Sequence, residues 1–124
     1  MKKRMLIMVA PFAFLTASLA QITRTASDAI VLERLQSETR KHIVYAEKEV
    51  QTEEFTITTS MNEVLQLDYP CWVYYVNYIE ETNNNHYLVV KESSGSLLEV
   101  RTKNSTEPDL ATWRTVKLIE VPFT

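Results

Sequence analysis

The stretch YPCWVYYVNYIEETNNNHYLVVKESSGSLLEVR, residues 69–101, decides the fold of this chain. Polar segments divide it into three runs rich in β-branched and aromatic residues, which cover 72–79, 86–91 and 97–101. Such runs favour strands, and the segments between them contain the asparagine, serine and glycine typical of turns. The sequence therefore predicts an antiparallel meander of three strands.

The first of these strands is expected to lie in the middle of the sheet. Side chains alternate between the two faces of a strand. One face would carry Trp72, Tyr74, Val76 and Tyr78, and the other would carry Cys71, Val73, Tyr75, Asn77 and Ile79. Both faces are largely apolar or aromatic, so we expect a helix to cover one side and loops or a partner to cover the other.

Residues 22–40 are predicted to form the one substantial helix. Thr25 and Asp28 have the spacing of a capping box at its start. Apolar side chains recur at helical spacing, at Ile22, Ala26, Ala29, Ile30, Leu32 and Leu35. A helix with one apolar stripe needs a surface to pack on, and the predicted sheet provides one.

Shorter segments extend the predicted sheet. Residues 43–45 fit a first strand or an extended connection, 55–59 fit a short strand, and 64–67 fit another strand or a continuation of it after a turn. Pro108 begins a predicted single helical turn over 108–113, and 116–121 has a strand-like pattern. The predicted fold is α+β, with one N-terminal helix packed on a curled antiparallel sheet of four to five strands.

The first 20 residues have the pattern of an export signal. A basic start, Lys2-Lys3-Arg4, precedes an apolar run over 5–15, and Ser18-Leu19-Ala20 places small residues at a cleavage site. We expect residues 1–20 to be a signal peptide and residues 21–124 to be a single small domain, exported to the periplasm or the cell exterior. The apolar run is short against the roughly 20 residues that span a bilayer.

The charge of the predicted mature chain is negative. Three of the 13 Lys and Arg residues lie in the signal, which leaves 10 against 16 Asp and Glu and a net charge of −6. A negative chain is a poor match for nucleic acid or for anionic lipid. We therefore expect no nucleic-acid partner and no membrane association after signal cleavage.

The sequence contains no recognisable catalytic, cofactor or metal motif. Cys71 is the only cysteine, which excludes an internal disulfide and favours a buried thiol over a bridge to another chain. A cysteine nucleophile would need His42 or His86 beside it. The polar groups near the aromatic strands are Asp68, Glu80, Glu81 and His86. They form no clear acid–base pair, so we expect no enzyme and no cofactor.

The candidate partner-binding residues are aromatic and asparagine side chains in the meander. Aromatic residues dominate interface hot spots, and an asparagine-rich loop tip is a recognition surface or simply a turn. The predicted set is Tyr75, Tyr78, Asn83, Asn84, Asn85 and Tyr87. The alternative for the tyrosines is that they fill the core.

The order of elements resembles that of known small exported domains. The resemblance rests on the opening segment ITRTASDAI (22–30), on Trp72-Val73-Tyr74 and on SGSLLEV (94–100). These resemble PepSY-like and cystatin-like domains and the propeptide-like inhibitors of streptopain-type cysteine proteases. The resemblance implies an α+β fold and a protein partner, an exported protease among the candidates. The chain lacks the Gln-x-Val-x-Gly loop of animal cystatins.

Two functional hypotheses follow. The first is an exported, non-catalytic binding module of the bacterial cell envelope, with protease inhibition as its sharper form. The second is a structural or assembly protein that pairs with a neighbour through an exposed sheet edge at 116–121 or 43–45. The sequence leaves the oligomeric state open.

Overall fold

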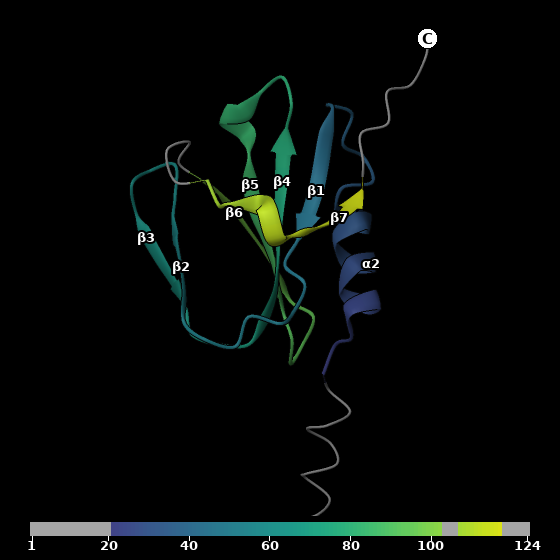
Figure 1. Cartoon of the computed structure of the whole chain (residues 1–124), viewed down its shortest axis with the longest axis vertical. Helices are drawn as coiled ribbons and strands as arrows, with labels where there is room; N and C mark the ends of the chain where they lie inside the picture. Colours follow the sequence, from purple (N-terminus) through teal and green to yellow (C-terminus); the bar gives the residue numbers. More distant parts are fainter. Residues whose placement is uncertain (1–20, 103–106, 118–124) are drawn as a thin grey trace, which may run out of the picture.

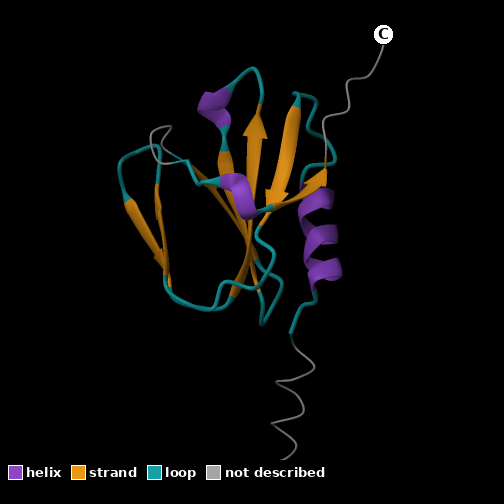
Figure 2. Cartoon of the chain, in the orientation of Figure 1, coloured by secondary structure: helices purple, strands orange, loops and turns teal. Residues whose placement is uncertain are grey.

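The computed structural model describes residues 21–102 and 107–117, and its elements confirm the α+β class. Within these residues, one α-helix, α2 (Arg24–Arg34), precedes the strands, and short 3-10 turns η1 (Thr82–Asn84) and η3 (Leu110–Thr112) lie between strands (Figure 2). The strands are β1 (His42–Ala46), β2 (Phe55–Thr58), β3 (Val64–Leu67), β4 (Cys71–Tyr78), β5 (His86–Lys91), β6 (Leu97–Arg101) and β7 (Arg114–Lys117).

Five strands form one antiparallel sheet in the order β6-β5-β4-β1-β7, and β2 pairs with β3 in a separate hairpin. The central position of β4 and the β4-β5-β6 meander confirm the prediction. The residues of β1 pair with β4 on one side and with β7 on the other, for example Ala46 with Tyr74 and with Arg114. The expectation that 43–45 form a sheet edge is therefore wrong.

One face of the sheet packs against α2 (Figure 1). This face carries the β4 side chains that the sequence assigned to one side, Trp72, Tyr74, Val76 and Tyr78. Val31 and Leu35 of the helix pack on them. Leu32 was expected on this apolar stripe but is 37% exposed, because the buried side of the helix is centred on Val31.

Both ends of the helix differ from the prediction. Thr23, not Thr25, is the N-cap, and its side chain accepts a hydrogen bond from the Ala26 amide at 3.1 Å. The helix ends at Arg34 instead of continuing to residue 40. Leu35 is its last buried apolar side chain, and the polar residues that follow leave the helix to make contacts described below.

The other face of the sheet is covered by the β2–β3 hairpin, which lies beside it at the left of Figure 1. Its core contains Ile57 and Leu67 of the hairpin with Cys71, Val73, Tyr75, Tyr87, Val89 and Val100 of the sheet. The Cys71 thiol is fully buried, as the sequence predicted. The cover is thus a segment of this chain.

Short turns join the strands. Gly95 has φ +79°, a left-handed conformation that favours glycine, and a Cβ there would meet the side chains of Ile22 and Ile30 at 3.4 Å. The predicted helical turn is present as η3, and Leu110 and Trp113 pack on the hairpin-side core. Of the strand predicted at 116–121, residues 118–121 lie outside the described residues.

The predicted signal peptide, residues 1–20, also lies outside the described part of the chain. Within residues 21–102 and 107–117, no helix has the length and apolar character needed to cross a membrane.

Candidate functional site

The structure buries most of the predicted partner-binding residues. Tyr75, Tyr78, Tyr87 and Asn85 are 1%, 2%, 6% and 1% exposed. The expectation that they offer an accessible surface is wrong, because both faces of the sheet are covered. Asn83 is exposed and Asn84 is half-buried, so partner binding by these two stays a prediction.

Tyr75 and Tyr87 belong to the hairpin-side core. Their rings meet edge to face with centroids 5.2 Å apart, and Phe55 of the hairpin meets Tyr87 in the same way at 5.6 Å. The Tyr75 hydroxyl lies 3.5 Å from Thr102 Oγ1. These contacts anchor the hairpin on the sheet.

Asn85 fixes the β4–β5 connection. Its Oδ1 accepts a hydrogen bond from the Tyr78 amide at 2.7 Å, and its Nδ2 donates to Asn77 Oδ1 at 3.2 Å. Its backbone carbonyl accepts from the amide and the hydroxyl of Thr102, each at 3.2 Å. A buried amide with all these partners has a structural role.

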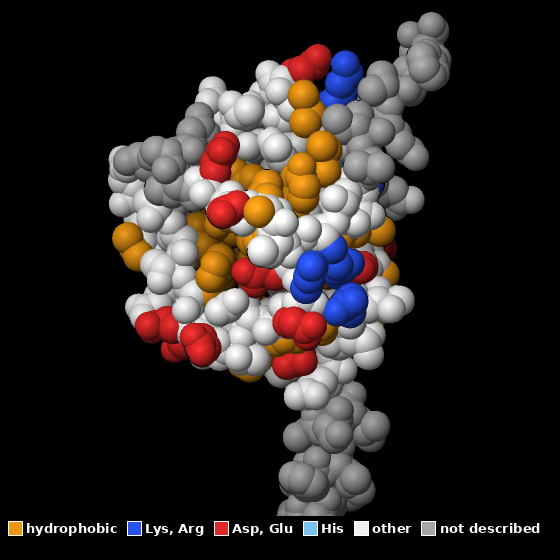
Figure 3. Space-filling view, viewed as in Figure 1, with side chains coloured by type: hydrophobic (Ala, Val, Ile, Leu, Met, Phe, Trp, Pro, Cys, Tyr) orange, Lys and Arg blue, Asp and Glu red, His pale blue; other side chains and the backbone are white. Residues whose placement is uncertain are grey.

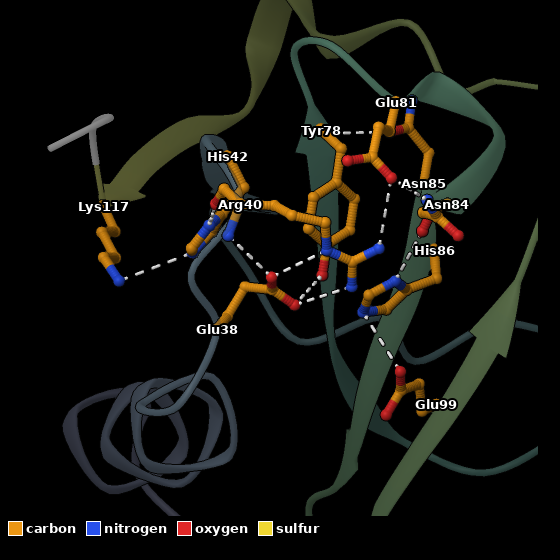
Figure 4. A network of polar contacts seen from close by, with 10 residues as sticks. All are labelled: Glu38, Arg40, His42, Tyr78, Glu81, Asn84, Asn85, His86, Glu99 and Lys117. Atoms are coloured by element: carbon orange, nitrogen blue, oxygen red, sulfur yellow. Dashed lines mark hydrogen bonds and ion pairs between the residues drawn. The ribbon is translucent and has the colours of Figure 1, made fainter. Parts of the chain in front are cut away.

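Tyr78 is the centre of a polar cluster on the helix side, here called the Tyr78 cluster: Glu38, Arg40, His42, Tyr78 and His86 (Figure 4). The two histidine rings lie on either side of the tyrosine ring, with centroids 5.7 and 5.6 Å from it. The Arg40 guanidinium lies over the ring, 4.5 Å from its centroid. This is a cation–π contact.

Glu38 connects the members of this cluster. It accepts hydrogen bonds from Arg40 Nε and Nη2 at 2.8 and 2.9 Å and from the Tyr78 hydroxyl at 3.0 Å. The hydrogen bonds from Arg40 lower the pKa of Glu38 to about 2. Burial, with the neighbouring Glu38 carboxylate, raises the pKa of Tyr78 to about 12. The carboxylate and the neutral phenol are therefore the forms present at neutral pH.

The two histidines are oriented in the same way. Nδ1 of His42 is 2.7 Å from the carbonyl of Arg40, and Nδ1 of His86 is 2.9 Å from the carbonyl of Asn84. A carbonyl oxygen only accepts hydrogen bonds, so each Nδ1 carries a proton. Nε2 of His42 lies 3.5 Å from Lys117 Nζ, whereas Nε2 of His86 has no hydrogen-bond partner among the described residues.

A small cavity of about 90 Å³ opens in front of His86, between the C-terminal end of α2 and strands β5 and β6. Its lining residues, here called the His86 pocket, are Arg34, Leu35, Glu38, Arg40, Tyr78, Asn84, His86, Glu99 and Arg101. Glu99 Oε1 accepts a hydrogen bond from Arg34 at 2.5 Å, and Oε2 lies 3.4 Å from His86 Nε2. Burial lowers the pKa of His86, with Arg34 and Arg101 acting in the same direction against Glu99.

The loop between β2 and β3 is the second candidate. Met61 and Val64 are 77% and 69% exposed. The Thr59 hydroxyl accepts hydrogen bonds from the amides of Met61 and Glu63, both at 3.2 Å, and the Thr59 amide donates to the Glu63 carbonyl at 2.8 Å. The hairpin therefore presents two exposed apolar side chains, Met61 in the hydrogen-bonded loop and Val64 at the start of β3.

The loop is also attached to the main sheet. The Ser60 amide donates to the Arg101 carbonyl at 3.0 Å, and Thr59 forms a β-bridge with Thr102. Asn62 has φ +66°, a left-handed conformation that asparagine tolerates better than most residues. These contacts hold the exposed side chains away from the core.

The carboxylates and histidine considered for acid–base chemistry do not converge. Asp68 lies just before the start of β4, whereas Glu80 and Glu81 follow its end. Glu80 is exposed and pairs with Lys41 at 3.4 Å. Glu81 lies 3.7 Å from Arg40 and accepts from Asn84. Of these four, only His86 lines the pocket, and the described residues contain no group of three or more metal-ligating side chains.

Acidic side chains gather in the lower part of the view in Figure 3. Glu49, Glu53 and Glu54 are exposed in the connection between β1 and β2. This connection also borders a shallow groove of about 340 Å³ beside Trp113. None of the described residues that line this groove has a buried polar side-chain atom without a hydrogen-bond partner, so we assign the groove no ligand.

Comparison of the chain with protein-family models, with curated proteins and with solved structures gives no match. Function is therefore inferred from the geometry of the molecule.

Proposed function

We propose that this chain is an exported, non-catalytic binding module that holds a partner protein through the β2–β3 loop. The supporting observation is the exposure of Met61, on a loop fixed by Thr59, and of Val64, which directly follows this loop at the start of β3. Exposed apolar side chains on a rigid backbone favour binding, because little conformational entropy is lost when the partner docks. Methionine also adapts well to the shape of an interface.

The sharper form of this proposal is inhibition of an exported protease. A loop that keeps its backbone shape can occupy a substrate cleft without paying a large ordering cost. The resemblance to cystatin-like domains and to propeptide-like inhibitors agrees with this role. The loop is formed by residues 59–63 and is followed by Val64, so its chemistry differs from the missing Gln-x-Val-x-Gly loop.

The experiment is capture of partners from the exported proteins of the host, followed by calorimetry with each purified partner. We expect Met61→Ala and Val64→Ala to weaken binding by about tenfold or more each, as hot-spot residues do. Leu32→Ala is the matched control, since Leu32 is an exposed apolar residue on the helix. If the partner is a protease, its activity should fall to zero at one equivalent. Equal affinity of all variants would overturn the proposal.

We also propose, as a second candidate, assembly through the free side of β7. The supporting observation is that β7 pairs only with β1 among the described strands and so ends the sheet order. Unpaired strand edges are templates for pairing with another chain. Light scattering on the purified protein tests this: a concentration-dependent dimer supports it, and a monomer at high concentration contradicts it.

A further inference from the structure

His86 presents a buried hydrogen-bond acceptor to the His86 pocket. Its side chain is 7% exposed, and its Nδ1 proton is donated to the carbonyl of Asn84. In the neutral ring the other nitrogen, Nε2, carries a lone pair and no proton. Nε2 has no hydrogen-bond partner in residues 21–102 or 107–117. A buried acceptor without a donor is costly, so this atom favours a ligand that donates a hydrogen bond.

The neighbour of Nε2 is another acceptor. Glu99 Oε2 lies 3.4 Å away, while Oε1 of the same carboxylate is bound by Arg34 at 2.5 Å. The guanidinium groups of the same pocket would attract an anion, but neither Nε2 nor Glu99 Oε2 can donate a hydrogen bond to one. A carboxylate or phosphate is therefore a poor partner for Nε2.

A cation is also disfavoured. Three guanidinium groups line the pocket, from Arg34, Arg40 and Arg101, against two carboxylates. Both carboxylates are already paired, Glu38 with Arg40 and Glu99 with Arg34. An ammonium group would enter a region of net positive charge. A divalent metal would meet the same charge, and the described residues contain no group of three or more side chains that could hold it.

We infer that the His86 pocket binds an uncharged hydroxyl group of a polyol or saccharide, which donates a hydrogen bond to His86 Nε2 and accepts one from the arginines that line the pocket. A hydroxyl is suited to this role because one atom both donates and accepts. The lining is polar apart from Leu35 and Tyr78, which also belong to the hydrophobic core, so a largely apolar ligand is disfavoured.

The size of the pocket limits how much of the ligand enters. A volume of about 90 Å³ corresponds to roughly three water molecules. This space admits a hydroxymethyl group or the edge of one sugar ring, and the rest of the ring would face solvent. The proposed ligand is thus held by its hydroxyl edge, with a Kd of about 1 mM for a few hydrogen bonds.

The test is NMR titration of the full chain labelled with ¹⁵N, following the ring nitrogens of both histidines. The probes are glycerol, methyl β-D-glucopyranoside and methyl β-D-galactopyranoside, added to about 100 mM, well above the expected Kd. We expect at least one probe to shift the His86 Nε2 resonance saturably and to leave His42 unchanged. Sodium acetate, methylammonium chloride, acetamide and zinc chloride represent the other ligand classes.

Two variants separate binding from structural loss. His86→Leu removes the acceptor, and its binding is followed through the backbone amides of the residues that line the pocket. The substitution should weaken binding by about tenfold or abolish it. His42→Leu is the matched control, because it loses the same kind of carbonyl contact while the pocket lining is unchanged. Wild-type titration reports on the site even if a variant unfolds. The inference is overturned if no polyol or glycoside shifts His86, if only another ligand class does, or if the affinity of folded His86→Leu equals that of wild type.

Discussion

Asp28 of α2 accepts two hydrogen bonds from the guanidinium of Arg114 of β7, at 2.8 and 3.0 Å. The two residues are 86 positions apart and join the helix to the last described strand of the sheet. The Tyr74 hydroxyl of the central strand donates to the same carboxylate at 2.6 Å. Burial alone would raise the pKa of Asp28, but the hydrogen bonds from Arg114 and Tyr74 outweigh it and hold the pKa below its ordinary value.

Replacing this carboxylate should destabilise the fold. Asp28→Asn removes the charge that the guanidinium and the phenol face, and we expect a loss of about 2 kcal/mol in the free energy of unfolding. Urea denaturation measures it. Glu33→Gln is the control, because Glu33 is an exposed acid on the same helix. A loss of stability no larger than that of Glu33→Gln would show that the hydrogen bonds of Asp28 with Arg114 and Tyr74 do not stabilise the fold.

Glu38 should make the protein sensitive to acid. Its pKa is about 2 in the folded protein against an ordinary value of 4.5, so the unfolded chain takes up the proton first. The stabilisation is fully present above pH 4.5 and is lost as the pH falls toward 2. Stability curves of Glu38→Gln and wild type should converge over this range. Stability curves that stay parallel over this range would contradict the lowered pKa of Glu38.

His86 should add a second pH dependence in a higher window. Its folded pKa is below the ordinary 6.5, mainly because it is buried. The unfolded chain therefore binds the proton first, and the stabilisation is present above pH 6.5 and lost as the pH falls. Between pH 6.5 and about 5, above the range of most carboxylates, His86→Leu should show a smaller loss of stability than wild type. An identical slope in both proteins would refute this.

The Cys71 thiol should be inert in the folded protein. It is fully buried, and burial together with the nearby Glu47 carboxylate raises its pKa to about 11. Ellman's reagent at pH 8 should give no reaction until denaturant is added, then one thiol per chain. Rapid reaction of the native protein, or a reducible dimer, would show that the thiol is accessible.

The sequence predicted the centre of the fold because local patterns determine it. Alternation along β4 separated Tyr74 from Tyr75 and assigned them to opposite faces, as the two cores confirm. The predicted helix boundaries were wrong because tertiary contacts determine where this helix ends. Glu38 has helical propensity, yet it leaves the helix to bind Arg40 and Tyr78.

The candidate sites were harder to predict because they join distant segments. Arg34 and Glu99 are 65 positions apart, and Tyr78 and Glu38 are 40 apart. No local pattern connects them. The β2–β3 loop did leave a signal, since Met61 is an apolar residue between the turn formers Ser60 and Asn62. The covering of Tyr75 and Tyr87 by the hairpin has no such signal, so the sequence leaves open whether these tyrosines bind a partner or fill the core.

The measurement that tests the proposed function most directly is the affinity of a purified exported partner for wild type, Met61→Ala, Val64→Ala and Leu32→Ala. We expect Met61→Ala and Val64→Ala to bind about tenfold or more weakly and Leu32→Ala to bind like wild type. Unchanged binding by the loop variants, with all four proteins folded, would show that the β2–β3 loop is not the binding surface.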